Sequence, residues 1–184
     1  MRKVFFWCVA ALCLAMACSA WSQPAKNDQS SAANQRMQDR ISREVYHQLV
    51  MLPQLTIFDN LSYKIDGGTV TLMGDVRNAV LKDEAQQAVK NIEGVQNVNN
   101  EIEILPPSPN DDRIRRAVAR SLFNDDRLFK YSMGSVPPIH IIVKGGHVTL
   151  DGVVDNQTDK NEAGIKAKSV PGVFSVQNNL RVGS

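Results

Sequence analysis

Cysteine is absent from this chain after residue 18, and its three cysteines are Cys8, Cys13 and Cys18. If that segment is removed on export, the mature chain has no thiol, which excludes disulfides and thiolate chemistry. Histidine is also scarce: His140 and His147 flank one turn, but a metal site would need further ligands at fixed geometry. No nucleophile elbow, paired-carboxylate motif or phosphate-binding glycine loop occurs. We therefore expect no catalytic residues, no metal site and no cofactor.

A long apolar run is also absent after the N-terminal segment, which itself has the features of an export signal. It begins with a short basic stretch, "MRK", continues with "VFFWCVAALCLAMACSA", and ends in small residues before Gln23. The apolar run is short for a membrane span, which needs about twenty apolar residues. We predict a secretory signal peptide over residues 1–22. In an alternative interpretation, "LAMAC" is a lipoprotein box, and a lipidated Cys18 tethers the protein to a membrane.

Two polar breaks divide the rest of the chain into two segments that repeat one another. The first break, residues 23–36, is predicted to be a flexible linker, and the second, residues 106–111, is proline-rich. Between and after them lie the segments 37–105 and 112–184. The phrase "GGTVTLMGDV" at 67–76 returns as "GGHVTLDGVV" at 145–154, an offset of 78. In the preceding helix the offset is 73, so the second copy carries five additional residues between its helix and its first strand.

Each copy shows the same order of hydrophobic patterns. Ile114, Val118 and Leu122 lie on one face of a helix, as do their counterparts in the first copy. Two alternating runs follow around a Gly-Gly turn, then a second helix and a last alternating run. Gly74 and Gly152 fall on the inward face of a strand, which suggests close approach of a helix or a bulge. The prediction is an α+β protein of two tandem αββαβ modules, each a three-stranded mixed sheet with two helices on one face.

The repeated signature resembles that of the BON domain family. It consists of the glycine turn, Val-Thr-Leu-x-Gly-x-Val, the Gly-Val after the second helix, and Val-x-Asn-x-hydrophobic, as in "EGVQNVNNEIEI" and "PGVFSVQNNLRV". This resemblance implies a non-enzymatic protein of the bacterial envelope, exported to the periplasm, that binds phospholipid and protects the envelope under osmotic or envelope stress. The alternative function that it implies is a chaperone or adaptor that binds exported polypeptides. For that function we expect binding at an exposed strand edge or in the cleft between the modules.

Charge is distributed unequally between the two copies. Residues 37–105 contain 6 basic and 10 acidic side chains, whereas residues 112–184 contain 11 and 7, so the formal charges are −4 and +4. Arg113, Arg116 and Arg120 fall on one line of the helix, opposite Ile114 and Val118. A basic face near aromatic side chains is typical of a surface that contacts anionic lipid. The predicted lipid-binding residues are Arg113, Arg116, Arg120, Arg127 and Lys130, with Phe129 or Tyr131 at the membrane boundary.

Two other interpretations of this basic surface stay open. Exposed helix faces are normally charged, so the arginines can be solvated or can lie between the two modules. The basic second copy can also pair with the acidic first copy or with a protein partner. A nucleic-acid partner is not expected, because the two charges cancel over the exported chain.

Overall fold

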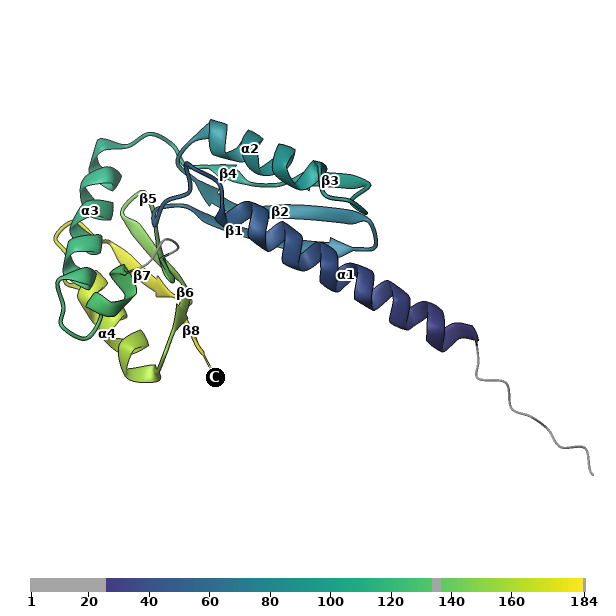
Figure 1. The fold of residues 1–184 in the computed structure, drawn as a ribbon. Coiled ribbons are helices and arrows are strands. Elements are labelled where there is room, and N and C mark those ends of the chain that lie inside the picture. Colours follow the sequence, from purple (N-terminus) through teal and green to yellow (C-terminus); the bar gives the residue numbers. More distant parts are fainter. Residues whose placement is uncertain (1–25, 134–136, 184) are drawn as a thin grey trace, which may run out of the picture.

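The computed structural model describes residues 26–133 and 137–183, and the predicted signal peptide with Cys18 lies outside them. The two modules follow one another along the chain (Figure 1). The first contains α1 (Lys26–Val50), β1 (Asn60–Asp66), β2 (Thr69–Val76), α2 (Ala79–Lys90), β3 (Asn97–Asn100) and β4 (Glu103–Ile104). The second contains α3 (Pro109–Phe123), the 3-10 helix η1 (Phe129–Ser132), β5 (Ile139–Lys144), β6 (His147–Val154), α4 (Gln157–Lys168), β7 (Ser175–Asn178) and β8 (Arg181–Val182).

The predicted mixed sheet is confirmed in both modules. β1 runs antiparallel to β2, and β3 and β4 both run parallel to β2. The second module repeats this arrangement with β5, β6, β7 and β8. The last strand of each module is therefore present in two short pieces along the same edge of the central strand.

An asparagine of the repeated signature accounts for the break in the last strand. Asn100 donates through Nδ2 to the carbonyl of Lys82 on α2, and its Oδ1 accepts from the amide of Ile102. Asn178 makes the equivalent bonds with Lys160 and Leu180. This side chain ties the strand to the helix above it and turns Ile102 and Leu180 into the core, where both are buried.

Gly74 and Gly152 approach a neighbouring strand and not a helix. Their φ angles are +122° and +128°, in a region that L side chains rarely adopt. A Cβ built on Gly152 would lie 1.9 Å from the carbonyl oxygen of Pro138, and one on Gly74 would lie 2.1 Å from that of Asn60. Only glycine fits, because the carbonyl of the adjacent strand occupies the place of its side chain.

Both predicted linkers differ from the structure. α1 begins at Lys26, so residues 26–36 are helical where a flexible linker was expected. The reason is compositional, since this stretch contains neither glycine nor proline. Its N-terminal part projects beyond the sheet (Figure 1). In the second break α3 begins at Pro109, and Ser108 is the N-cap, accepting from the amide of Asp111. Asp112 lies inside that helix.

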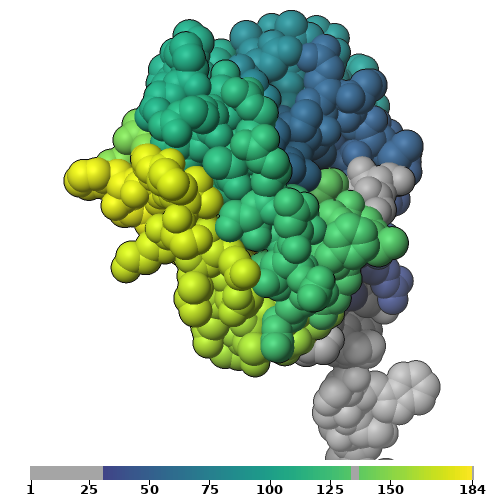
Figure 2. Space-filling model, turned by 90° about the vertical axis from the view of Figure 1, so that its left-hand side faces the viewer, coloured from purple at the N-terminus to yellow at the C-terminus, as the bar shows by residue number. Residues whose placement is uncertain are grey.

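The two modules are packed directly against each other (Figure 2). Ile57 and Phe58, in the loop between α1 and β1, pack against the core of the second module. The carbonyl of Ile57 also accepts a hydrogen bond of 2.7 Å from the amide of Ile141 on β5. A segment of the first module therefore covers part of the edge of the second sheet.

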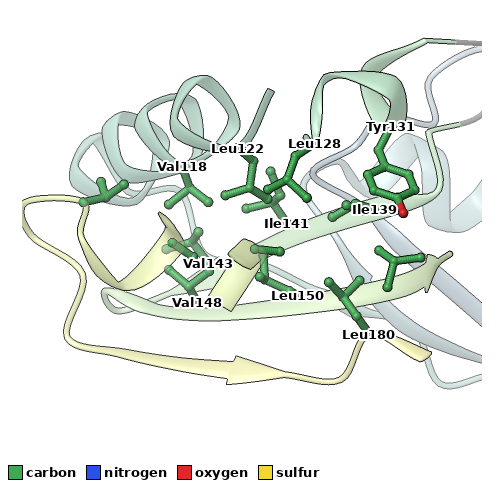
Figure 3. Packing of buried hydrophobic residues seen from close by; sticks show 14 of the residues in the cluster. Val118, Leu122, Leu128, Tyr131, Ile139, Ile141, Val143, Val148, Leu150 and Leu180 are labelled. Carbon is green, nitrogen blue, oxygen red and sulfur yellow. The ribbon is translucent and has the colours of Figure 1, made fainter. Parts of the chain in front are cut away.

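Each module nevertheless has its own hydrophobic core. The first cluster is formed around Val70, Leu72 and Leu81, and the second around Ile114, Ile141 and Leu150. The five additional residues of the second copy serve its own core, because the segment that contains them includes Leu128 and Tyr131, which are buried among α3 and β5 (Figure 3). The chain is thus one small scaffold built twice, with a shared contact between the copies.

Candidate functional site

The outer face of α3 presents the predicted arginine stripe to solvent. The helix is held on the second sheet by Ile114, Val118 and Leu122, all fully buried. Asp111 also anchors it, because its carboxylate accepts from the amides of Gly145 and Gly146 in the hairpin turn, both at 2.9 Å. The anchored helix turns Arg113, Arg116 and Arg120 outward, and all three are exposed.

These arginines have no acidic partner within residues 26–133 and 137–183. Arg113 donates to the side-chain oxygen of Asn110 at 2.9 Å, which leaves its charge uncompensated. Arg116 and Arg120 form no ion pair in the described part of the chain, and neither does the exposed Arg127. The three cations on the outer face of α3 are therefore free to meet an anionic surface.

Arg115 behaves differently, although it lies on the same helix. Its side chain is buried, pairs with Asp112 at 2.7 Å and donates to the carbonyl of Val143. Asp112 also forms an ion pair with Arg77 of the first module, with 3.3 Å between the guanidinium nitrogen and the carboxylate oxygen. This arginine is therefore part of the attachment of α3 to the sheet and to the first module.

A shallow hollow of about 600 Å³ lies beside Arg120, between α3 and α4. Ser121, Asn124 and Ser169 contribute polar groups to it. Lys166 also lines it but is paired with Asp125 at 2.8 Å, and this hydrogen bond raises the pKa of the lysine and lowers that of the aspartate. Sequence reasoning missed the hollow, because its two walls are 45 residues apart in the chain.

Lys130 is exposed but paired with two carboxylates, and Tyr131 is buried, so neither is a free surface group as predicted. Lys130 Nζ lies 2.6 Å from Asp155 and 2.8 Å from Asp159, and these hydrogen bonds raise its pKa. Tyr131 is only 5% exposed and donates through its hydroxyl to Asp159 at 2.7 Å. The expectation of Tyr131 at a membrane boundary is therefore wrong, because the side chain fills the core and anchors a buried carboxylate.

Asp159 completes this buried group. Burial alone would raise the pKa of its carboxyl, but the hydrogen bonds from Lys130 and Tyr131 lower it by more, so its pKa is below the ordinary value. The amide of Asp155 donates to the Tyr131 hydroxyl at 2.8 Å, so the phenol both donates and accepts. The group fixes η1 against the start of α4.

We predict that Tyr131→Phe lowers the free energy of unfolding by about 1–2 kcal/mol, because a buried carboxylate loses a donor and an amide loses its acceptor. Urea denaturation followed by circular dichroism measures this. Tyr46→Phe is the control, since Tyr46 is 58% exposed and its change should stay within about 0.5 kcal/mol. Equal midpoints for the two variants would contradict the buried network.

Phe129, the other aromatic residue predicted at the membrane boundary, lies at the surface. It is 53% exposed, and Met133, four residues later, is 65% exposed. Sequence reasoning did not select Met133, which lies at the end of the irregular segment. These two apolar side chains follow the end of α3 along the chain.

The charges between the modules do not follow the predicted opposition of an acidic and a basic copy. Lys144 of the second module forms an ion pair with Glu103 of the first, so here the basic copy supplies the cation, as expected. In the ion pair between Arg77 and Asp112, the first module supplies the cation and the second module the anion. Arg77 also lies 5.7 Å from the centre of the Phe58 ring. The ion pairs between the modules are therefore of mixed direction, and the exposed arginines Arg113, Arg116 and Arg120 form none of them within the described residues.

His140 of β5 lies in this contact. It is partly buried, and its Nδ1 is buried without a hydrogen-bond partner among the described residues. Burial lowers its pKa, and the negative charges of Asp151 and Asp59 only partly oppose this. His147 lies opposite Lys144 in the pairing of β5 with β6, and its Nδ1 is hydrogen-bonded to the hydroxyl of Ser175. The two histidines are therefore not in contact with each other.

We predict that the melting temperature falls as the pH is lowered below about 6.5, the ordinary pKa of histidine. The folded pKa of His140 is lowered, so its stabilising effect is complete above the unfolded pKa and is lost as the unfolded state takes up a proton. Scanning calorimetry between pH 7.5 and 5.5 measures the change. His140→Gln should flatten this part of the profile, and an unchanged slope would contradict the assignment.

Within the described residues, no group of three or more histidine, cysteine or acidic side chains is arranged to hold a metal ion. The helices described there also include none with the length and apolar character needed to cross a membrane. The fold is thus a pair of small α+β modules.

The BON domain model matches residues 38–106 and again residues 110–184, and the chain therefore belongs to the BON domain family. It is similar to Osmotically-inducible protein Y of Escherichia coli (strain K12), with 30% identity over 131 residues, 66% of this chain and 61% of that protein. The match thus covers less than two thirds of that relative.

Solved structures of CdsD, a structural protein of the Type III secretion system of Chlamydia trachomatis, are also similar. For its C-terminal domain the identity is 13% and the TM-score 0.32, over 77% of this chain and 96% of that one. A second CdsD structure gives 13% and 0.31, over 79% and 94%. Likeness at this level supports no conclusion about function.

Proposed function

We propose that the protein binds anionic phospholipid head groups through the outer face of α3, as a peripheral and non-enzymatic factor of the bacterial envelope. The observation that carries the proposal is the row of exposed arginines on α3, Arg113, Arg116 and Arg120, which have no acidic partner among the described residues. Arg127 is also exposed but follows the end of the helix, so it does not extend the row. A guanidinium group binds phosphate oxygens with two parallel hydrogen bonds. Phe129 and Met133 would enter the interfacial region beside it.

The expected strength agrees with a peripheral role. Each basic residue near an anionic membrane contributes about 1 kcal/mol. Three such residues and a limited apolar contribution produce reversible attachment that weakens with salt. The modules can therefore leave the membrane without unfolding.

The predicted signal peptide supports a place in the envelope, and the name of the Escherichia coli relative supports a role under osmotic stress. Both belong to the proposal. If Cys18 is lipidated, α1 would act as a spacer between the membrane anchor and the two modules. The intact mass of the mature protein distinguishes a start at Gln23 or Trp21 from a lipidated Cys18.

Vesicle flotation tests the proposal. The mature protein should float with vesicles of phosphatidylglycerol and phosphatidylcholine and remain at the bottom with phosphatidylcholine alone. Raising the salt concentration from about 0.05 M to 0.5 M should release it, because screening shortens the range of the attraction. Equal flotation with both vesicle types, or salt-independent binding, would contradict an electrostatic contact.

A further inference from the structure

A cavity of about 570 Å³ lies between the two modules and is separate from the arginine face of α3. One wall comes from the end of α1 and includes Tyr46 and Leu49. The opposite wall comes from the second module and includes His140, Asp151 and Arg181. The cavity is therefore apolar on the side of the helix, and its charged groups lie on the side of the second sheet, next to Pro137, Pro138 and Val153.

The third side of this cavity is the edge of β1. The four consecutive residues Asn60, Leu61, Ser62 and Tyr63 all line it. In a strand successive side chains point to opposite faces, so four in a row indicate that the strand presents its edge, with its backbone, to the cavity. β1 is paired on its other side with β2.

The equivalent strand of the second module, β5, shows which backbone amides point away from the sheet at this edge. β5 occupies the same place as β1, and Ile141 pairs with Leu150 as Tyr63 pairs with Leu72. The amide of Ile141 points away from β6, because it donates to the carbonyl of Ile57 in the first module. The alternation of an antiparallel pair then places the amides of Tyr63 and Leu61 on the free edge of β1.

No backbone group of the described residues 26–133 and 137–183 outside β2 bonds to Leu61, Ser62 or Tyr63. The two edges thus differ: that of β5 is partly covered by a loop of the first module, whereas that of β1 faces the cavity. A row of backbone donors and acceptors at strand spacing is matched by another extended chain.

We propose that the edge of β1 binds an extended segment of an incompletely folded polypeptide, which adds a strand to the first sheet inside this cavity. The side chains of an added strand alternate between the two walls. One set meets Tyr46, Leu49 and Leu55, and the other meets His140 and Arg181. The ligand class is therefore a segment with alternating apolar and polar residues, about four residues long at its contact with β1.

Fluorescence anisotropy with a labelled heptapeptide of alternating valine and glutamine tests this proposal on the full mature chain. Two further peptides carry backbone N-methyl groups, one on the valines and the other on the glutamines. Only one set of amides can face β1, so one methylated peptide should bind at least about tenfold more weakly and the other should bind nearly as the parent. Equal affinity of all three would overturn strand addition, as would a failure of the parent to bind.

Two matched variants test whether the peptide binds in this cavity. Tyr46→Asp should weaken binding at least about tenfold, because the charge faces the apolar wall. Met51→Asp is the control, since both side chains are exposed (58% and 65%) near the end of α1 but Met51 does not line the cavity. Equal effects would overturn the assignment to this cavity. A third outcome is that the peptide does not bind but the protein dimerises with rising concentration, and that Tyr46→Asp abolishes the dimer. This would assign the edge of β1 to a second copy of the chain and would also overturn the peptide proposal.

This binding is independent of the lipid proposal. Arg116→Glu should leave the affinity for the peptide unchanged while vesicle binding falls. Loss of vesicle binding in the wild-type protein would leave the peptide result untouched, so the two proposals can fail separately.

Discussion

The double variant Arg116→Glu, Arg120→Glu is expected to bind anionic vesicles at least about a hundredfold more weakly than the wild-type protein. The change removes two positive charges and adds two negative ones on the outer face of α3. At about 1 kcal/mol for each unit of charge near the membrane, the loss is about 4 kcal/mol. Vesicle titration at low salt, followed by sedimentation or flotation, measures the ratio of the two affinities.

The repeat offers a matched control for this variant. Arg43 and His47 occupy on α1 the positions that Arg116 and Arg120 occupy on α3, and both are exposed. Arg43→Glu, His47→Glu lowers the formal charge of the first module by three units, against four for the α3 variant. Its affinity should stay within about threefold of wild type. An equal loss in both variants would show that net charge decides binding and would remove α3 as a defined site.

The second large effect is expected for Gly152→Ala, which should lower the free energy of unfolding by about 3–5 kcal/mol. A φ of +128° is strained for alanine, and its Cβ would lie 1.9 Å from the carbonyl oxygen of Pro138. Backbone strain and overpacking each cost about 1–3 kcal/mol. Because a domain of this size has about 5–15 kcal/mol in total, the second module should be close to unfolding.

Gly145→Ala provides the comparison in the same hairpin. Its φ is +60°, but a Cβ there would have no heavy atom within 4 Å. The expected cost is about 1 kcal/mol, from the left-handed backbone alone. Denaturant unfolding of both variants measures the difference. Equal costs would contradict the close approach of the two strands.

The sequence predicts most of the fold because the repeat consists of local patterns. Hydrophobic spacing places Ile114, Val118 and Leu122 on one helix face, and the same spacing places Arg116 on the opposite face. Both placements are confirmed. The glycine turn and the order of the five elements are likewise local properties. Because they occur in both copies, each copy supports the assignment made for the other.

The parts that were not predicted depend on contacts between distant residues. Tyr131 looks like a surface aromatic until α4 brings Asp159 to its hydroxyl, 28 residues later. Gly74 was assigned to contact with a helix or to a bulge, and its partner is the neighbouring strand. No local pattern marks Ile57 as a residue that covers the edge of another module. The acidic residues Asp155 and Asp159 after β6 were the only available signal that Lys130 is paired.

The most direct measurement of the proposed lipid contact is an NMR experiment on the full mature chain with vesicles that contain spin-labelled anionic lipid. If the outer face of α3 meets the membrane, the amides from Arg113 to Arg120 should show the strongest relaxation enhancement. The equivalent amides of α1, from Arg40 to His47, should show little. Enhancement that is equal on the two helices, or stronger on α1, would contradict the central claim.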